Sequence, residues 1–323
     1  MTRIHSIALA IAAIALAPAL AQAEATFPDK PITFVVPFAA GTATDQIARA
    51  IGNGVSAEVK QPVVIDNKAG ASGFIASQQV AKAAPDGYTV LITTNTTHAA
   101  NEHLYKKMPY DPVKDFAPIT ALGKGGQIMV VNPSFPAKTV AEFVAMAKKE
   151  PGKYSFGSGS SSSRMAGELL QQMADIKLLH VPYKSNTLAV TDLLGGQINM
   201  MITDTATGLP QVKSGKLRAL GVSGSKRSPL APDVPTIAEA GVKGYEMGYW
   251  FAAYAPSKTP PAVVKRLNEL LVKAAKSDAA KTVFYDPTGT EVFTTTPDEM
   301  AKFQAAESRK WGSIVKAAGI EAE

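Results

Sequence analysis

Short apolar runs alternate with amphipathic segments along the first part of the chain. The runs at residues 32–38, 63–65 and 88–93 have the length and the β-branched content of buried strands. Residues 45–59 and 75–84 instead place apolar side chains three and four positions apart, which predicts helices. Because strands and helices alternate, we expect an α/β architecture with mainly parallel sheets that are flanked by helices.

A second series of the same kind starts near Gln127. Its strand candidates are residues 127–131, 153–158, 198–203 and 217–223, and its helix candidates are residues 140–149, 165–173 and 189–194. The second series repeats the alternation of the first. The pattern therefore predicts two lobes, each built on its own sheet.

In each series, a loop of small residues connects a predicted strand to the helix that follows it. Residues 38–45 read FAAGTATD, and residues 157–163 read GSGSSSS. Small side chains let a ligand approach the backbone, and the first amides of a helix lack partners within it and carry a partial positive charge. Both loops are therefore candidate anion sites. Two such lobes facing each other would present both sites to one cleft.

Each loop also has a purely structural interpretation. A Gly/Ser tract such as residues 157–163 is often a flexible linker, although here an amphipathic helix candidate follows it without a proline. Thr44 or Asp45 could simply cap the helix that follows the first loop. Helix capping and ligand binding are compatible with each other.

The first residues have the pattern of a secretory signal. Arg3 precedes the apolar run 7–17, then Pro18 and the small-residue pattern Ala-Gln-Ala at 21–23. The run is about half of the roughly 20 residues that span a bilayer. We expect cleavage near Ala23, leaving residues 1–23 as a signal peptide and the mature protein in the periplasm.

Composition and charge limit the kinds of partner that this protein can bind. The chain has 323 residues, of which 46% are hydrophobic and 19% charged, which is typical of a globular protein. The net charge of +6 is scattered in pairs such as Lys106-Lys107 and Lys226-Arg227. A nucleic-acid surface needs a contiguous basic patch, so we expect no nucleic-acid partner.

The enzyme motifs that we searched for are absent from the sequence. There is no cysteine, which excludes disulfides and thiolate chemistry, and there are only four histidines. The sequence also lacks a Gly-x-Ser-x-Gly elbow, a Walker loop and a complete dinucleotide fingerprint. We therefore expect no catalytic residues, no metal and no cofactor. The alternative is an exported hydrolase or lyase acting on a carboxylate, with His98, His180 or Asp204 as the base.

Seven short segments together resemble one family. They are PITFVVPF at 31–38 with Gly41 and Asp45, PDGY at 85–88, LYKKMPYDP at 104–112, HVPYK at 180–184, DLLGG at 192–196, GKLRAL at 215–220, and DVPT at 233–236 with EAG at 239–241. In this order and spacing, the chain resembles the Bug-type extracytoplasmic solute receptors of tripartite tricarboxylate transporters.

The resemblance implies a two-domain periplasmic binding protein of type II, which closes like a Venus flytrap on a small carboxylate. The ligand would be a dicarboxylate, a tricarboxylate or an aromatic carboxylate, passed on to a membrane permease or a sensor protein. We expect lobe 1 to comprise residues 24–124 and 226–323 and lobe 2 to comprise 125–225, with a C-terminal helix that can pack on lobe 2. We expect a monomer.

The resemblance also assigns ligand-binding residues by position. The first loop would supply Phe38, Gly41, Thr42, Ala43 and Asp45, and the second Ser158, Gly159, Ser160, Ser161, Ser162 and Arg164. Further walls would come from Ala71, Phe74, Thr94, Thr96, Tyr183, Thr203 and Asp204, and from Trp250 with Phe251.

This chain departs from the family pattern in the pocket. The family usually has glycine at the positions of Ser158 and Ser160, histidine at Arg164, asparagine at Phe74 and aspartate at Thr203. Threonine in the last position disfavours an amino-acid ligand unless Asp204 substitutes. Phe74 would add apolar surface and Arg164 could bind a carboxylate, which suggests an aromatic or apolar-bodied acid. The alternatives are that Arg164 faces solvent and Phe74 belongs to the core.

Overall fold

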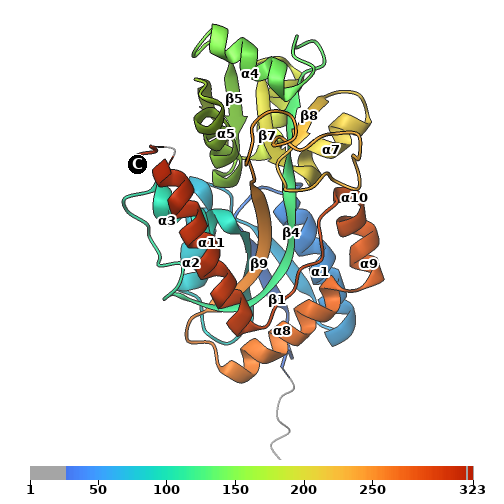
Figure 1. The fold of residues 1–323 in the computed structure, drawn as a ribbon. Helices are drawn as coiled ribbons and strands as arrows, with labels where there is room; N and C mark the ends of the chain where they lie inside the picture. The colour runs from blue at the N-terminus through green and yellow to red at the C-terminus, as the bar shows by residue number, and fades with distance from the viewer. Residues whose placement is uncertain (1–26, 318, 323) are drawn as a thin grey trace, which may run out of the picture.

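The computed structural model describes residues 27–317 and 319–322 (Figure 1). The predicted signal peptide lies outside the described residues. The strands are β1 (Ile32–Val36), β2 (Val63–Asn67), β3 (Thr89–Thr94), β4 (Phe116–Val131), β5 (Ser155–Ser158), β6 (Leu179–Pro182), β7 (Met200–Asp204), β8 (Arg218–Val222) and β9 (Gly248–Pro256).

Helices separate most of these strands. The α-helices are α1 (Ala43–Val59), α2 (Phe74–Ala81), α3 (Asn101–Leu104), α4 (Val140–Lys149), α5 (Ser161–Ala174), α6 (Asn186–Leu194), α7 (Thr205–Lys213), α8 (Pro261–Ala275), α9 (Asp278–Ala280), α10 (Asp286–Thr288) and α11 (Pro297–Ala317). Three short segments have helical turns that are tighter or wider than those of an α-helix. They are η1 (Ala71–Gly73), η2 (Thr96–Ala100) and η3 (Lys281–Tyr285). Among the described residues, no helix combines the length and the apolar character that crossing a membrane requires.

The strands form two lobes that share β4 (Figure 1). In lobe 1 the strand order is β2-β1-β3-β9-β4, and in lobe 2 it is β8-β4-β7-β5-β6. Residues 116–126 of β4 pair with β9, whereas residues 127–131 pair with β7 and β8. The two-lobed α/β fold is therefore confirmed. The expected lobe limits at 124/125 and 225/226 stay predictions.

The sheets are mixed in direction. Strands β2, β1 and β3 are parallel in lobe 1, as are β6, β5 and β7 in lobe 2. Strands β9 and β4 add antiparallel pairs to both sheets. The sequence did not predict β9, β6 or the first half of β4. In β4, Pro118 and the glycines at 123, 125 and 126 resemble turn signals.

Alternation along the strands of lobe 1 divides its side chains between two cores. Ile32, Phe34 and Val36 of β1 pack with α1 and α8 on one face, whereas Val35 faces the other core, with α2 and α11. In β9, Tyr249 and Phe251 face the first core and Trp250 the second. The side of β9 on which each aromatic residue lies therefore decides whether it can reach the ligand cleft.

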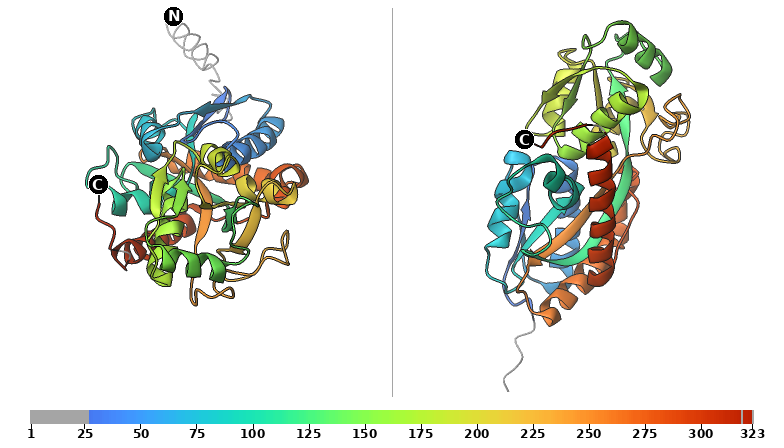
Figure 2. Two further views of the ribbon diagram at one scale, coloured as in Figure 1. Left: turned by 90° about the horizontal axis from the view of Figure 1, so that it is seen from above. Right: turned by 60° about the vertical axis from the view of Figure 1, so that its left-hand side comes forward.

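Helix α11 runs along lobe 1 and ends beside lobe 2 (Figure 2). It packs against β4 and η2, where Trp311 is buried, and Glu307 accepts a hydrogen bond of 3.2 Å from the indole of Trp250. At its end, Gln172 of α5 donates a hydrogen bond to the carbonyl of Ala317. The C-terminal helix therefore contacts both lobes but is built mainly on lobe 1.

Candidate functional site

The loop between β1 and α1 is held in place by its own side chains. Thr42 caps α1: its hydroxyl accepts from the amide of Asp45 and donates to the carbonyl of Ala39 at 2.8 Å. Asp45 accepts from the amide of Gly41 at 2.9 Å and from Arg49 at 3.0 Å. Gly41 has a φ of +82°, where a side chain would be strained. Asp45 thus fixes the loop rather than pointing at a ligand.

These contacts set the charge of Asp45. Burial alone would raise the pKa of its carboxyl, but the hydrogen bonds from Arg49, Gly41 and Asn67 lower the pKa below its ordinary value overall. A depressed pKa means that the folded protein favours the carboxylate more than the unfolded chain does. The stabilisation is complete above the unfolded pKa and is lost as the pH falls through the folded one.

We therefore expect Asp45 to contribute to acid unfolding. Between about pH 5 and pH 2, the melting temperature of the wild type should fall more steeply than that of Asp45→Asn, because the variant has no carboxylate to protonate there. Thermal melts followed by circular dichroism at several pH values measure the two slopes. Parallel slopes would show that the Asp45 contacts add no stability.

The loop between β5 and α5 is tied to two further helices. Ser160 caps α5, and its hydroxyl accepts from the amide of Ser163 at 3.2 Å. The amide of Gly159 donates to Asn186 Oδ1 at 3.0 Å, and Asn186 Nδ2 donates to Asp204 at 2.9 Å. Asp204 in turn caps α7 through the amide of Thr207 at 2.9 Å. One chain of hydrogen bonds therefore positions this loop against the starts of α6 and α7.

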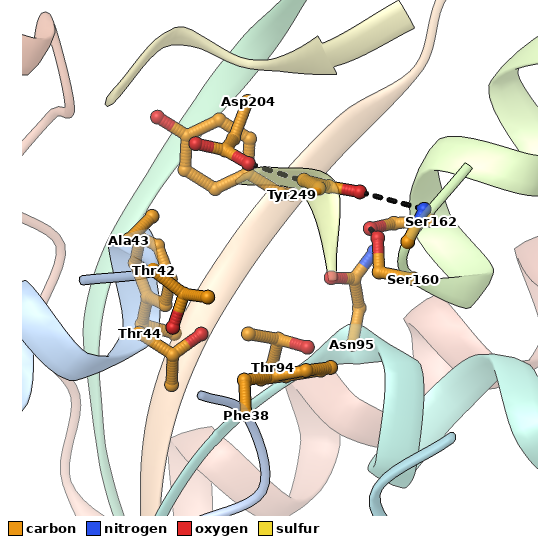
Figure 3. A pocket seen from close by; sticks show the side chains of 13 residues that line it. Phe38, Thr42, Ala43, Thr44, Thr94, Asn95, Ser160, Ser162, Asp204 and Tyr249 are labelled. Carbon is orange, nitrogen blue, oxygen red and sulfur yellow. Dashed lines mark hydrogen bonds between the residues drawn. The ribbon is translucent and has the colours of Figure 1, made fainter. Parts of the chain in front are cut away.

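The two loops meet at a narrow cavity of about 40 Å³. In Figure 3, Thr42, Ala43 and Thr44 lie on one side of it and Ser160 and Ser162 on the other, with Asp204 and Tyr249 at one end. The volume suits a few water molecules or one carboxylate group. Its lining comprises Phe38, Thr42, Ala43, Thr44, Thr94, Asn95, Gly159, Ser160, Ser162, Asn186, Asp204, Tyr249 and Phe251.

Asn95 lines this cavity with a polar side chain that is fully buried. It is 0% exposed, its Nδ2 lies 3.4 Å from the carbonyl of Gly248, and its Oδ1 has no hydrogen-bond partner within the described residues. In Figure 3 this oxygen faces the cavity. A buried acceptor without a partner is costly, so we expect a water molecule beside a bound solute to donate to this oxygen.

A wide cavity of about 290 Å³ adjoins the narrow one and shares Phe38, Gly159 and Ser160 with it. Its remaining lining comprises Pro37, Gly70, Ser72, Gly73, Tyr105, Ser158, Ser161, Arg164, His180, Pro182, Tyr183 and Lys184. The hydroxyl of Tyr183 donates to Asp192 at 2.8 Å, so its ring rather than its hydroxyl forms the wall. The two cavities together can hold a small acid with an extended body.

Most of the residues assigned by resemblance line one of these cavities. Those at the narrow cavity are Phe38, Thr42, Ala43, Thr94, Gly159, Ser160, Ser162 and Asp204, and those at the wide one are Phe38, Ser158, Gly159, Ser160, Ser161, Arg164 and Tyr183. Gly41, Asp45, Phe74, Thr96 and Thr203 line neither, and the side chain of Ala71 lies outside what the structure describes. Gly41 and Asp45 shape their loop, while Thr96 and Thr203 are fully buried.

The side chains of Phe74 and Trp250 pack in or against the hydrophobic core. The ring of Phe74 contacts those of Tyr105 at 4.9 Å and Tyr110 at 5.9 Å, and of these three residues only Tyr105 lines the wide cavity. Trp250 points to the core under α11, as its bond to Glu307 shows, whereas Phe251 lines the narrow cavity. The core alternative for Phe74 describes its surroundings better than a role as a ligand wall.

Several lining residues were not assigned from the sequence. Thr44 and Asn95 lie beside assigned residues, and Asn186 follows the serine that caps α6. Tyr249 comes from β9, which the sequence did not predict. Burial raises the pKa of Tyr249 to about 12, so its phenol stays protonated between Thr205 at 3.0 Å and Thr290 at 2.9 Å.

The candidate bases for a hydrolase or lyase have other roles. His98 is fully buried, stacks on Tyr254 at 3.9 Å, and its pKa is lowered to about 3 by burial. Asp204 caps α7 and binds Asn186. His180 bonds to Ser158 at 2.7 Å. His98 and Asp204 are therefore engaged in structural contacts.

Side chains of the two lobes also touch across the cleft. The hydroxyl of Ser161 on α5 donates to Asn101 Oδ1 on α3 at 2.8 Å, and both residues are buried. Tyr249 joins Thr205 of lobe 2 to Thr290 of lobe 1. The contact between Ser161 and Asn101 joins the two lobes, so we expect it to favour a state in which the lobes are close together.

We expect Ser161→Ala to weaken ligand binding about five- to tenfold, because closure would leave Asn101 Oδ1 without its partner. Isothermal calorimetry on the variant measures the change. Ser313→Ala, which removes an exposed hydroxyl on α11, serves as the control and should bind normally. Unchanged affinity in Ser161→Ala would mean that this contact does not contribute to closure.

Known proteins share this architecture over nearly the whole chain. A family model described as "Tripartite tricarboxylate transporter family receptor" matches residues 47–320. BugT of Bordetella pertussis (strain Tohama I) is 34% identical over 299 residues, covering 92% of this chain and 91% of BugT. The solved structure of R. palustris Rpa4515 with adipate has a TM-score of 0.89 and 35% identity, covering 92% of this chain and 100% of that one. MatC of Rhodopseudomonas palustris with bound malate has a TM-score of 0.84 and 31% identity, covering 90% and 100%.

Proposed function

Because the chain belongs to the family of tripartite tricarboxylate transporter receptors, we propose that it captures a small carboxylate between its two lobes for delivery to a membrane permease. Members of this family are periplasmic solute-binding receptors and not enzymes, so the hydrolase or lyase alternative has no support. The proposal rests on one observation. Residues 42–44 of lobe 1 and Ser160 and Ser162 of lobe 2 line the same narrow cavity.

The chemistry of that cavity suits a carboxylate. The starts of α1 and α5 offer amides without helical partners, and Thr44, Thr94 and Ser162 add hydroxyls. Hydrogen bonds to a charged group contribute about 1.5 to 3 kcal/mol each. Three or four of them contribute about 4.5 to 12 kcal/mol, compared with roughly 8 kcal/mol for micromolar binding, so contacts to the body of the solute must offset the ordering costs. Because the donors come from both lobes, closure and binding strengthen each other.

The relatives support the same chemistry. In their solved structures, Rpa4515 holds adipate and MatC holds malate, and both ligands are small carboxylates. The proposed solute is therefore a small organic acid whose carboxylate occupies the narrow cavity and whose body extends into the wide one. We also propose that the chain is exported with cleavage near Ala23, acts as a monomer, and has lobes divided at 124/125 and 225/226.

Denaturing the purified protein and identifying released acids by mass spectrometry tests the proposed function. A thermal-shift screen of mono-, di- and tricarboxylates complements it, because a ligand that binds the folded state raises the melting temperature. We expect at least one carboxylate to raise the melting temperature and to be recovered unchanged after incubation. If no carboxylate shifts the melt while an uncharged solute does, the proposed ligand class is wrong.

A further inference from the structure

A loop of lobe 1 forms one wall of the wide cavity. The loop lies between β2 and α2, and its residues Gly70, Ser72 and Gly73 line the cavity. All three have a positive φ, which is +131° at Gly70, +51° at Ser72 and +87° at Gly73. A residue with a side chain rarely adopts such a φ, so contacts with the rest of the protein must hold Ser72 in this conformation.

Two hydrogen bonds hold Ser72. Its carbonyl accepts from Asn101 Nδ2 at 2.9 Å, and its hydroxyl lies 2.7 Å from the hydroxyl of Tyr105. The next residue packs closely as well, because a Cβ atom at Gly73 would lie 2.6 Å from Cγ2 of Thr97. Asn101 begins α3 and Tyr105 directly follows it. The two ends of α3 therefore anchor the loop.

The side-chain amide of Asn101 also contacts the other lobe. Its Oδ1 accepts from the hydroxyl of Ser161 at 2.8 Å, and Ser161 is the first residue of α5. A carbonyl oxygen such as that of Ser72 can only accept, so Nδ2 must face Ser72 and Oδ1 must face Ser161. Asn101 is 0% exposed. One buried amide therefore joins the loop of lobe 1 to the start of α5 in lobe 2.

The contact with Ser161 determines how firmly Asn101 holds the loop. With Ser161 in place, only one orientation of the amide satisfies both of its ends, and the two hydrogen bonds strengthen each other. When the lobes part, Oδ1 loses this partner and water can reach it from the open cleft. The Asn101 side chain then gains rotational freedom, which weakens its bond to Ser72.

On the basis of the proposed function, we propose that Asn101 couples the closing of the lobes to the ordering of residues 70–73. The loop is free to move while the lobes are apart, and it becomes fixed when Ser161 reaches Asn101. Because Ser161, Ser72 and Gly73 all line the wide cavity, the fixed loop closes one side of this cavity around the body of the solute. Asn101 itself lines neither cavity, so it is a positioning residue.

A cross-link that closes the lobes without a solute tests this coupling. The chain has no cysteine, so Gln172→Cys with Ala317→Cys introduces two unique thiols where α5 meets the end of α11. A short bis-maleimide joins the thiols, and hydrogen exchange followed by mass spectrometry measures the amides of residues 70–73. We expect the cross-link to slow their exchange about tenfold. Unchanged exchange, or thiols that cannot be joined, would overturn the proposal.

Variants of the cross-linked protein assign the coupling to its residues. Ser161→Ala should reduce the slowing to about threefold or less, although the changed residue lies in the other lobe. Asn101→Asp keeps an acceptor for Ser161 but removes the donor to Ser72, so it should have the same effect. Exchange in α5 should stay slow in both variants, because the cross-link keeps the lobes together. If either variant retains the full slowing, the proposal fails.

Tyr105→Phe separates local anchoring of the loop from coupling between the lobes. It removes the hydroxyl that bonds to Ser72 but leaves the amide of Asn101, so exchange should rise by a similar factor with and without the cross-link. Ser313→Ala, an exposed change on α11, should alter neither rate. If Asn101→Asp does not fold, Ser161→Ala decides the outcome alone. Because no carboxylate is used, a negative result here leaves the proposed function intact.

Discussion

Replacing Gly159 with alanine is expected to abolish ligand binding and to destabilise lobe 2. A Cβ atom at this position would lie 1.8 Å from the carbonyl carbon of Ser185 and 2.1 Å from the amide nitrogen of Asn186. These are backbone atoms, so the loop and the start of α6 must separate. The separation breaks the hydrogen bonds from Gly159 to Asn186 and from Asn186 to Asp204, and it moves Ser160 and Ser162 away from the narrow cavity.

We expect a loss of at least about a hundredfold in affinity and about 3 kcal/mol in the free energy of unfolding. Calorimetry with an identified ligand and urea denaturation measure the two effects. Gly195→Ala is the matched control, because its Cβ would meet Asp192 O only at 3.6 Å. The control should change stability by less than about 0.5 kcal/mol. Normal binding by Gly159→Ala would show that the close approach of these two backbones is not needed.

Removing one hydroxyl from each lobe should have the second largest effect on binding. Thr44→Val and Ser162→Ala each delete a donor that lines the narrow cavity. Each should weaken carboxylate binding about tenfold, because a hydrogen bond to a charged group is lost. Together they should weaken it about a hundredfold, while the melting temperature of the unliganded protein changes little.

The control for this pair is Thr191→Val, which removes an exposed hydroxyl on α6 and should bind normally. Calorimetry on the wild type and the four variants gives the affinities, and melts without ligand show whether folding is affected. If the two lobes share the site, each single variant must weaken ligand binding. If Ser162→Ala weakens binding and Thr44→Val does not, lobe 1 contributes no hydroxyl to the carboxylate, and the shared site would need revision.

The parts of the site that are built from residues adjacent in the chain could be predicted from the sequence. Strand 32–38, the small residues after it and the helical periodicity that follows are adjacent in the chain, and the structure forms them as β1, a capped loop and α1. The same holds for residues 157–163, where the linker interpretation is wrong because Ser160 caps α5 directly. Helix capping and ligand-lining positions coincide at Thr42 and Ser160.

The parts that depend on pairing between distant segments could not be predicted. Tyr249 and Phe251 reach the cavity because β9 inserts antiparallel between β3 and β4, and no local pattern encodes that register. The side of β9 also separates Phe251 from Trp250. Phe74 was assigned by its place in a motif, but its packing with Tyr105 and Tyr110 comes from tertiary contacts.

A crystal structure of the protein with its carboxylate ligand tests the central claim most directly. We predict that the two oxygens of one carboxylate lie within about 3 Å of donors from both residues 42–44 and residues 160–162. A carboxylate bound by only one lobe, or bound away from the narrow cavity, would contradict the account.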